Sequence, residues 1–178
     1  MPKTIEVEIK GVAPYLMHRF PGETADTKGQ KKTGRKDYTL QAEESLYRDE
    51  KGVIYVPSTQ IEGAIVKAST DFQITGKGKK TYKDLSRSAL VVQPNAIPME
   101  PQEWVQDAQP VVVQRSRVMR YRPKWDQWKL HFKIEILDDQ FPVEIVKEIL
   151  DSARTYKGIG DFRPKYGRFI VTSFKEVT

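Results

Sequence analysis

Residues 158 to 169 read Gly158-Ile159-Gly160-Asp161-Phe162-Arg163-Pro164-Lys165-Tyr166-Gly167-Arg168-Phe169, between the clearest amphipathic helix pattern of the chain and its last strand pattern. Glycines permit backbone geometries with positive φ and leave peptide N–H groups uncovered by side chains. The three cations of this stretch, together with such N–H groups, suit an anion, and its three aromatic rings offer faces on which a base could stack. The stretch therefore indicates a site for a phosphate-bearing ligand.

The same glycines also have a purely structural interpretation. Gly158 is expected to end the preceding helix at its C′ position, where a left-handed residue is common. Gly160 and Gly167 would then serve turns, and the aromatic residues would belong to the core. Both interpretations stay open at the level of the sequence.

The composition is that of a basic globular chain rather than a disordered one. It has 178 residues, of which 38% are hydrophobic and 30% charged, with a formal net charge of +6. This length fits a single domain over residues 1–178. Cysteine is absent, which excludes disulfides and cysteine metal sites. Because no apolar run could cross a bilayer and the N-terminus has no signal-peptide core, we expect a cytoplasmic protein without a membrane partner.

Hydrophobic periodicity predicts the elements. Strands are expected over residues 4–10, 53–56, 89–93, 111–122, 128–137 and 169–174, and helices over 40–47, 59–72 and 142–157. The Thr59-x-x-Glu62 pattern predicts a capping box at the start of the second helix. Residues 94–109 contain several prolines and are expected to be irregular. The last strand is apolar on both sides, which predicts a central position in the sheet.

The strands over 111–122 and 128–137 are expected to pair as a hairpin around a turn at 123–127. The first arm carries the arginines Arg115, Arg117, Arg120 and Arg122, and two rings, Tyr121 and Trp125, lie near the tip of the hairpin. These arginines change parity between 117 and 120, so a bulge is needed to bring them to one face. A solvated face that protects a sheet edge is the alternative explanation for them.

Two lysine-rich segments are expected to be mobile loops inserted into the domain. Residues 20–39 have almost nothing to bury and carry Lys31, Lys32 and Arg35. Residues 75–88 carry Lys77, Lys79 and Lys80. A solvated connection would explain either loop alone, whereas two in one small domain favour a polyanionic partner.

The order strand, helix, strand, strand, helix, strand predicts an α+β fold of the ferredoxin-like type, with both helices on one face of the sheet. RNA-recognition motifs share this topology and use the uncovered face. Their Lys/Arg-Gly-Phe/Tyr signature is absent from this sequence, so an ordinary RNA-recognition motif is disfavoured.

Two segments match the motifs of a known family at corresponding places in this topology. They are Val56-Pro57-Ser58-Thr59-Gln60-Ile61-Glu62-Gly63-Ala64-Ile65, and the stretch 158–169 with its closing Gly-Arg-Phe. The first looks like the start of the first helix, and the second is similar to the glycine-rich loop, of the RAMP superfamily of CRISPR-associated RNA-binding proteins. The chain holds one such unit, whereas the processing endonucleases of that superfamily have two.

The resemblance implies a ferredoxin-like domain that coats guide RNA along basic surfaces, often in a filament with further copies or other effector subunits. It implies Gly158, Gly160, Gly167 and Arg168 as contacts to the nucleic-acid backbone. From the residues themselves we add Arg163, Lys165, Tyr166 and the basic side chains named above as candidates.

Catalytic candidates are weak. His18 and His131 are the only histidines and show no metal or triad spacing. Asp26 and Asp37 could serve metal-assisted cleavage, but aspartate in a polar loop is ordinarily just solvated. Walker, GxSxG and HExxH motifs are missing, so we expect no cofactor and no resident metal.

We therefore expect a non-catalytic binder of single-stranded nucleic acid, with RNA favoured over DNA. An endoribonuclease built on a histidine is one alternative. A phage or plasmid protein that coats single strands, or a structural subunit of a larger assembly, is the other.

Overall fold

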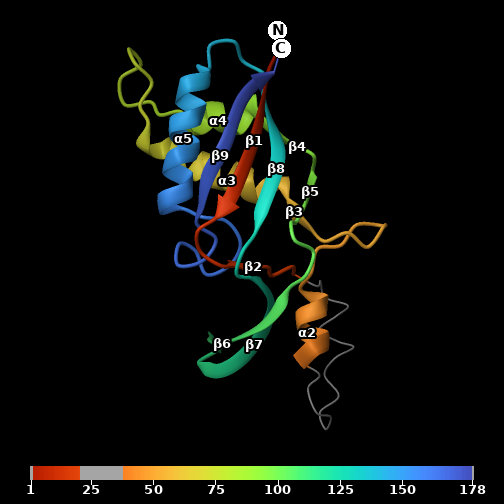
Figure 1. Ribbon diagram of the computed structural model, residues 1–178. Helices are drawn as coiled ribbons and strands as arrows, with labels where there is room; N and C mark the ends of the chain where they lie inside the picture. Colours follow the sequence, from red (N-terminus) through yellow and green to blue (C-terminus); the bar gives the residue numbers. More distant parts are fainter. Residues whose placement is uncertain (1, 21–37, 178) are drawn as a thin grey trace.

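The computed structural model describes residues 2–20 and 38–177, which form an α+β fold (Figure 1). The elements are β1 (Lys3–Gly11), β2 (Tyr15–Leu16), α2 (Tyr38–Glu44), β3 (Tyr55–Pro57), α3 (Ser58–Ala68), the 3-10 helix η1 (Ser69–Asp71), α4 (Lys83–Ala89), β4 (Leu90–Gln93), β5 (Ala96–Pro98), β6 (Val105–Val113), β7 (Ser116–Trp125), β8 (Lys129–Ile136), α5 (Val143–Tyr156) and β9 (Phe169–Val177).

The main sheet has four strands in the order β4-β8-β1-β9, and each neighbouring pair is antiparallel. Strand β1 alternates as the sequence predicts. Ile5, Val7 and Ile9 are buried, whereas Glu6 and Lys10 on its other side are exposed. This alternation gives the sheet one apolar face and one polar face.

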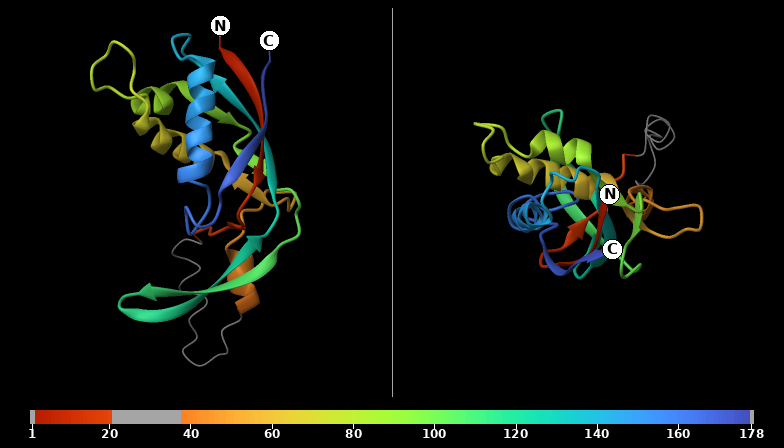
Figure 2. Two further views of the ribbon diagram at one scale, coloured as in Figure 1. Left: turned by 60° about the vertical axis from the view of Figure 1, so that its left-hand side comes forward. Right: turned by 90° about the horizontal axis from the view of Figure 1, so that it is seen from above.

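Helices α3, α4 and α5 lie together on the apolar face, and the polar face has no helix over it in the described part of the chain (Figure 2). Helix α5 buries Val146, Ile149, Leu150 and Ala153, the stripe expected from its sequence. These residues join the buried rows of the strands in one core. The two faces of the sheet therefore differ in chemistry as well as in cover.

Strand β9 lies at an edge of the sheet, so its predicted central position is wrong. Its only sheet neighbour among the described strands is β1, and Ile170 is 36% exposed. The apolar residues on its inner side pack below α5, and those on its outer side remain at the surface. Continuous apolar sequence here reflects an edge strand beside a helix.

The predicted hairpin between 111–122 and 128–137 is also wrong. Strand β7 instead pairs with β6, around a turn at Gln114 and Arg115 whose φ values are 47° and 68°. Strand β8 pairs with β1 and β4. Much of the segment 94–109, expected to be irregular, belongs to β5 and β6, and the β6–β7 hairpin projects away from the main sheet (Figure 1).

The start of α3 and the start of α4 also differ from the predictions. Thr59 lies inside the first turn of α3, so it cannot cap the helix, and the Oε1 atom of Glu62 accepts a hydrogen bond from the Val92 N–H (3.0 Å). The capping box is therefore wrong, although the helix itself is present. The second basic loop is shorter than 75–88, because α4 begins at Lys83.

Candidate nucleic-acid interface

The glycine loop, which we define as residues 158–168, packs tightly against its own chain. Gly158, Gly160 and Gly167 have φ values of +65°, +79° and +75°. A Cβ atom on Gly167 would lie 1.7 Å from the Ile159 carbonyl oxygen, and one on Gly160 would lie 2.6 Å from the Tyr15 ring. The structural interpretation of these glycines is therefore correct, since no other residue fits at either position.

Several peptide N–H groups of this loop are already engaged. The Gly167 N–H donates to the Pro14 carbonyl oxygen (2.7 Å), the Asp161 N–H to that of Leu16 (3.0 Å), and the Gly158 N–H to that of Ala153 (3.0 Å). Engaged N–H groups cannot also turn towards a phosphate without breaking these bonds. The side chains of the loop are thus better placed than its glycine backbone to meet a ligand.

One carboxylate of the loop holds three segments together. The Asp161 Oδ2 atom lies 3.1 Å from Arg122 Nε of β7 and 3.5 Å from His18 Nδ1, which follows β2. The guanidinium of Arg122, with 8% of its side chain exposed, also lies 5.1 Å from the centre of the Phe162 ring. Arg122 was expected to contact nucleic acid directly; the structure instead places it in an internal ion pair.

The surroundings of this cluster shift the pKa values of Asp161 and Arg122. The contact with His18, aided by the charge of Arg122, lowers the pKa of Asp161, although partial burial opposes the shift. Burial lowers the pKa of Arg122, and Asp161 opposes that change. Asp161 is therefore ionised at neutral pH and stabilises a buried cation.

We expect Asp161→Asn to destabilise the protein by about 1–3 kcal/mol at pH 7, because the buried Arg122 loses its carboxylate partner. The lowered pKa of Asp161 means that its contribution is complete above its ordinary value of 3.8 and is lost as the pH falls through the folded value. Urea unfolding of both proteins should show a gap that narrows below about pH 4. A gap that widens in acid would contradict this account.

A groove runs along the exposed side of α3 and joins the glycine loop to α4. At one end, a hollow of about 370 Å³ is lined by His18, Thr59, Gln60, Gly63, Lys67, Gly160, Asp161 and Arg163. At the other, a hollow of about 730 Å³ is lined by Thr59, Glu62, Gly63, Val66, Lys67, Thr70, Lys83, Ser86, Arg87, Leu90 and Lys157. Because Thr59, Gly63 and Lys67 line both hollows, we name the two together the α3 groove.

The cations of the α3 groove are largely unpaired. Among residues 2–20 and 38–177, Lys67, Lys83, Arg87 and Arg163 make no ion pair, and all four are exposed. Lys157 lies 3.6 Å from the Asp71 carboxylate. An open hollow with several unneutralised cations attracts polyanions.

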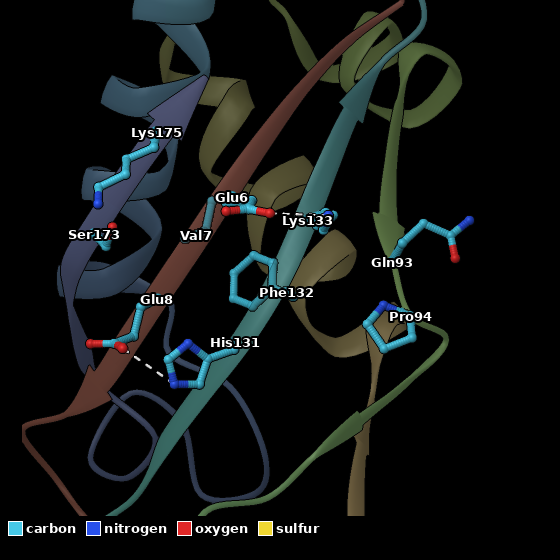
Figure 3. Close-up of a pocket in the computed structure, with 10 residues that line it drawn as sticks. All are labelled: Glu6, Val7, Glu8, Gln93, Pro94, His131, Phe132, Lys133, Ser173 and Lys175. Carbon is cyan, nitrogen blue, oxygen red and sulfur yellow. Dashed lines mark ion pairs between the residues drawn. The ribbon is translucent and has the colours of Figure 1, made fainter. Parts of the chain in front are cut away.

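On the uncovered face of the main sheet, in contrast, the basic side chains have acidic partners. Lys133 Nζ lies 3.0 Å from Glu6 Oε1, and His131 Nε2 lies 3.2 Å from Glu8 Oε2 (Figure 3). Lys129 pairs with Glu100 at 3.4 Å. Since carboxylates match the cations here, this face does not offer a track for phosphates.

The remaining arginines of the expected set are distributed over the β6–β7 hairpin. The register runs regularly from Val105 opposite Lys124 to Val113 opposite Ser116, so Arg117 and Arg120 point to opposite faces. No bulge separates them, so they are not brought to one face. Arg115 lies in the hairpin turn. These side chains form no continuous row with the α3 groove.

The other residues predicted to contact nucleic acid lie in several different parts of the chain. Lys165 and Arg168 are exposed on the glycine loop, and Lys165 Nζ lies 5.9 Å from the centre of the partly buried Tyr166 ring. Lys77, Lys79 and Lys80 are exposed on the turn between η1 and α4. Lys31, Lys32, Arg35, Asp26 and Asp37 lie outside the described residues.

Two rings expected to stack on bases belong to the core. Trp125 is 2% exposed and donates its indole N–H to the Pro101 carbonyl oxygen, and Phe169 is 1% exposed. Phe162 is 37% exposed and remains available for stacking. Lys67, Lys83 and Arg87 were missed, because helical lysines and arginines in sequence look like ordinary solvated positions.

The two histidines lie in different surroundings. His18 lines the α3 groove beside Asp161, whereas His131 lies on the uncovered face of the sheet, paired with Glu8. In the part of the chain that the structure describes, no three His, Cys, Asp or Glu side chains gather closely enough to hold a metal ion. His18 is thus the histidine that lines the α3 groove, next to the carboxylate of Asp161.

Comparison with known proteins gives no family for the chain: no model of a protein family matches it, and a search of curated proteins finds no match. Within residues 2–20 and 38–177, none of the helices has the length and apolar character needed to span a membrane.

Proposed function

We propose that the protein binds single-stranded nucleic acid in the α3 groove, with RNA as its favoured ligand. The observation that carries this proposal is the set of unpaired cations Lys67, Lys83, Arg87 and Arg163 along one open groove, in contrast to the paired charges of the uncovered sheet face. Such a groove neutralises a phosphodiester chain without reading its bases.

The preference for RNA rests on the two RAMP-like segments. Thr59, Gln60 and Gly63 come from the first segment, Gly160, Asp161 and Arg163 come from the second, and all six line one hollow of about 370 Å³. The strand order β4-β8-β1-β9, with α3 and α5 on one face, is also compatible with a ferredoxin-like sheet. On this basis we propose a ferredoxin-like, RAMP-like subunit that coats RNA, as in the backbone of a CRISPR effector.

A single strand fits this groove better than a duplex. Phe162 offers an exposed ring next to Arg163, and unpaired bases can stack on such a ring, whereas paired bases cannot. The test is fluorescence anisotropy with labelled oligonucleotides of equal length, as single-stranded RNA, single-stranded DNA and duplex. We expect the single-stranded RNA to bind most tightly; preference for the duplex would contradict the proposal.

Gly63 provides a separate test of the groove. It lies within α3 with open space around it, so the fold does not require a glycine there. Gly63→Ala should raise the free energy of unfolding by about 0.5–1 kcal/mol, because alanine favours helix. The added methyl group narrows the groove, so we expect affinity for single-stranded RNA to fall severalfold. Raised stability with unchanged affinity would place the ligand elsewhere.

The His18–Asp161 contact favours one alternative, an endoribonuclease. With Asp161 beside Nδ1, the other ring nitrogen of His18 could accept a proton from a ribose 2′-hydroxyl, while Lys67 and Arg163 in the same hollow would stabilise the developing negative charge. Under this alternative His18→Ala abolishes cleavage and retains binding, and His131→Ala cleaves like the wild type. Intact RNA after incubation with the wild type would rule the alternative out.

A further inference from the structure

The uncovered face of the main sheet is a second surface, on the opposite side from α3 and α5 (Figure 2). A hollow of about 580 Å³ opens on it, with Gln93 at one side and Lys175 at the other (Figure 3). In the described part of the chain no helix covers this hollow. A sheet face left without a second layer is a candidate for contact with another protein.

The polar side chains of this face form two parallel rows, one of carboxylates and one of basic groups. Strand β1 presents Glu6 and Glu8, and the neighbouring β8 presents Lys133 and His131. The register sets Glu6 level with Lys133 and Glu8 level with His131, which is why they pair at 3.0 Å and 3.2 Å (Figure 3). An acidic row beside a basic row, one strand apart, is complementary to a copy of itself.

We propose that this face joins two copies of the chain, related by a two-fold axis that runs along the strands between β1 and β8. Rotation about this axis lays β1 of each copy over β8 of the other, because the axis lies midway between these strands. Glu6 then meets the second copy's Lys133, and Glu8 meets its His131, each contact occurring twice. The Glu6–Lys133 ion pair and the Glu8–His131 contact of one chain each become part of a group of four alternating acidic and basic side chains.

The outer strands fit the same operation, since it lays β9 of one copy over β4 of the other. In the sheet register Lys175 lies opposite Glu6, and Gln93 lies opposite Lys133, so all four are at the same height along the strands. Lys175 of one copy therefore meets the amide group of Gln93 of the other copy rather than a cation. At the end of the sheet, Val177 meets Val91 by the same reasoning, and Val177 is 39% exposed in the single chain.

At one position along the strands, the proposed dimer brings two positive charges together. Lys10 meets the second copy's Lys129, but the carboxylate of Glu100 lies 3.4 Å from Lys129 and offsets this repulsion. Ion pairs exposed to water contribute little. In the dimer each charge lies between two opposite charges, which offsets the cost of removing water from it. The α3 groove lies on the other side of each sheet, so both copies keep it open. The proposal is thus independent of the ligand in the groove.

The test uses two charge reversals and sedimentation velocity on protein freed of nucleic acid by nuclease treatment. In Lys133→Glu, residue 133 meets Glu6 of the second copy, and in Glu6→Lys, residue 6 meets Lys133, so each variant alone repels itself. In an equimolar mixture both symmetry-related contacts join opposite charges. We expect the wild type to dimerise between about 1 and 100 μM, each variant to stay monomeric, and the mixture to dimerise.

Several results would overturn the proposal. A wild type that stays monomeric up to about 100 μM excludes the dimer. Variants that dimerise as the wild type does place the interface elsewhere. Monomeric variants whose mixture also stays monomeric exclude this axis. Glu6 and Lys133 are both exposed, and thermal unfolding of each variant would confirm that it is folded.

Discussion

Replacing Gly167 with alanine is expected to destabilise the protein by about 3 kcal/mol or more, the largest effect of any single methyl group in the glycine loop. Its φ of +75° disfavours a side chain, and the new Cβ atom would lie 1.7 Å from the Ile159 carbonyl oxygen. The backbone must move to relieve this contact, which breaks the hydrogen bond from the Gly167 N–H to Pro14. Urea unfolding measures the change.

Gly76 gives the matched control, because it has a φ of +78° with nothing within 4 Å of the added atom. Gly76→Ala carries only the strain of a left-handed residue, about 1 kcal/mol. The difference between the two variants isolates the steric contact. Equal effects in both variants would contradict the tight packing that we describe for the loop.

The second large effect concerns binding. Reversing two charges in the α3 groove, Lys67→Glu together with Arg163→Glu, should weaken binding of single-stranded RNA roughly 30-fold or more, because two phosphate contacts become repulsive. Both side chains are exposed, so the fold should be retained. Fluorescence anisotropy at one fixed salt concentration measures the loss.

A variant with the same net charge separates the groove from overall electrostatics. Lys51→Glu with Lys147→Glu reverses two exposed charges outside the groove, one after α2 and one on α5. We expect this control to weaken binding far less than the groove variant. Equal losses of RNA affinity in the two variants would mean that binding depends on net charge alone and that the α3 groove is not the binding site.

The hydrophobic periodicity of the sequence correctly predicted which side of a single strand or helix is buried. The strict alternation around Ile5, Val7 and Ile9 and the stripe of α5 both appear in the structure. Strand partners were harder to predict, because pairing depends on which chain segments compete. The segments 111–122 and 128–137 were predicted to form a hairpin. Instead, Gln114 and Arg115 form a tighter turn that pairs β7 with β6, and β8 pairs with β1.

The site was only partly predictable for the same reason. The glycine loop stands out in the sequence, but Lys67 and Arg87 acquire meaning only when α3 and α4 lie beside that loop. Arg122 shows the converse, since its charge suggested a phosphate contact and its neighbour Asp161 places it in the interior. Sequence reveals which side chains carry charge, whereas the fold decides which charges remain unpaired.

The most direct test of the α3 groove is the dependence of RNA affinity on salt. If Lys67, Lys83, Arg87 and Arg163 each neutralise one phosphate, the logarithm of the association constant should fall against the logarithm of the salt concentration with a slope of about −3. Lys67→Ala should make this slope shallower by about 0.7. A flat dependence in the wild type, or an unchanged slope in Lys67→Ala, would contradict nucleic-acid binding in the α3 groove.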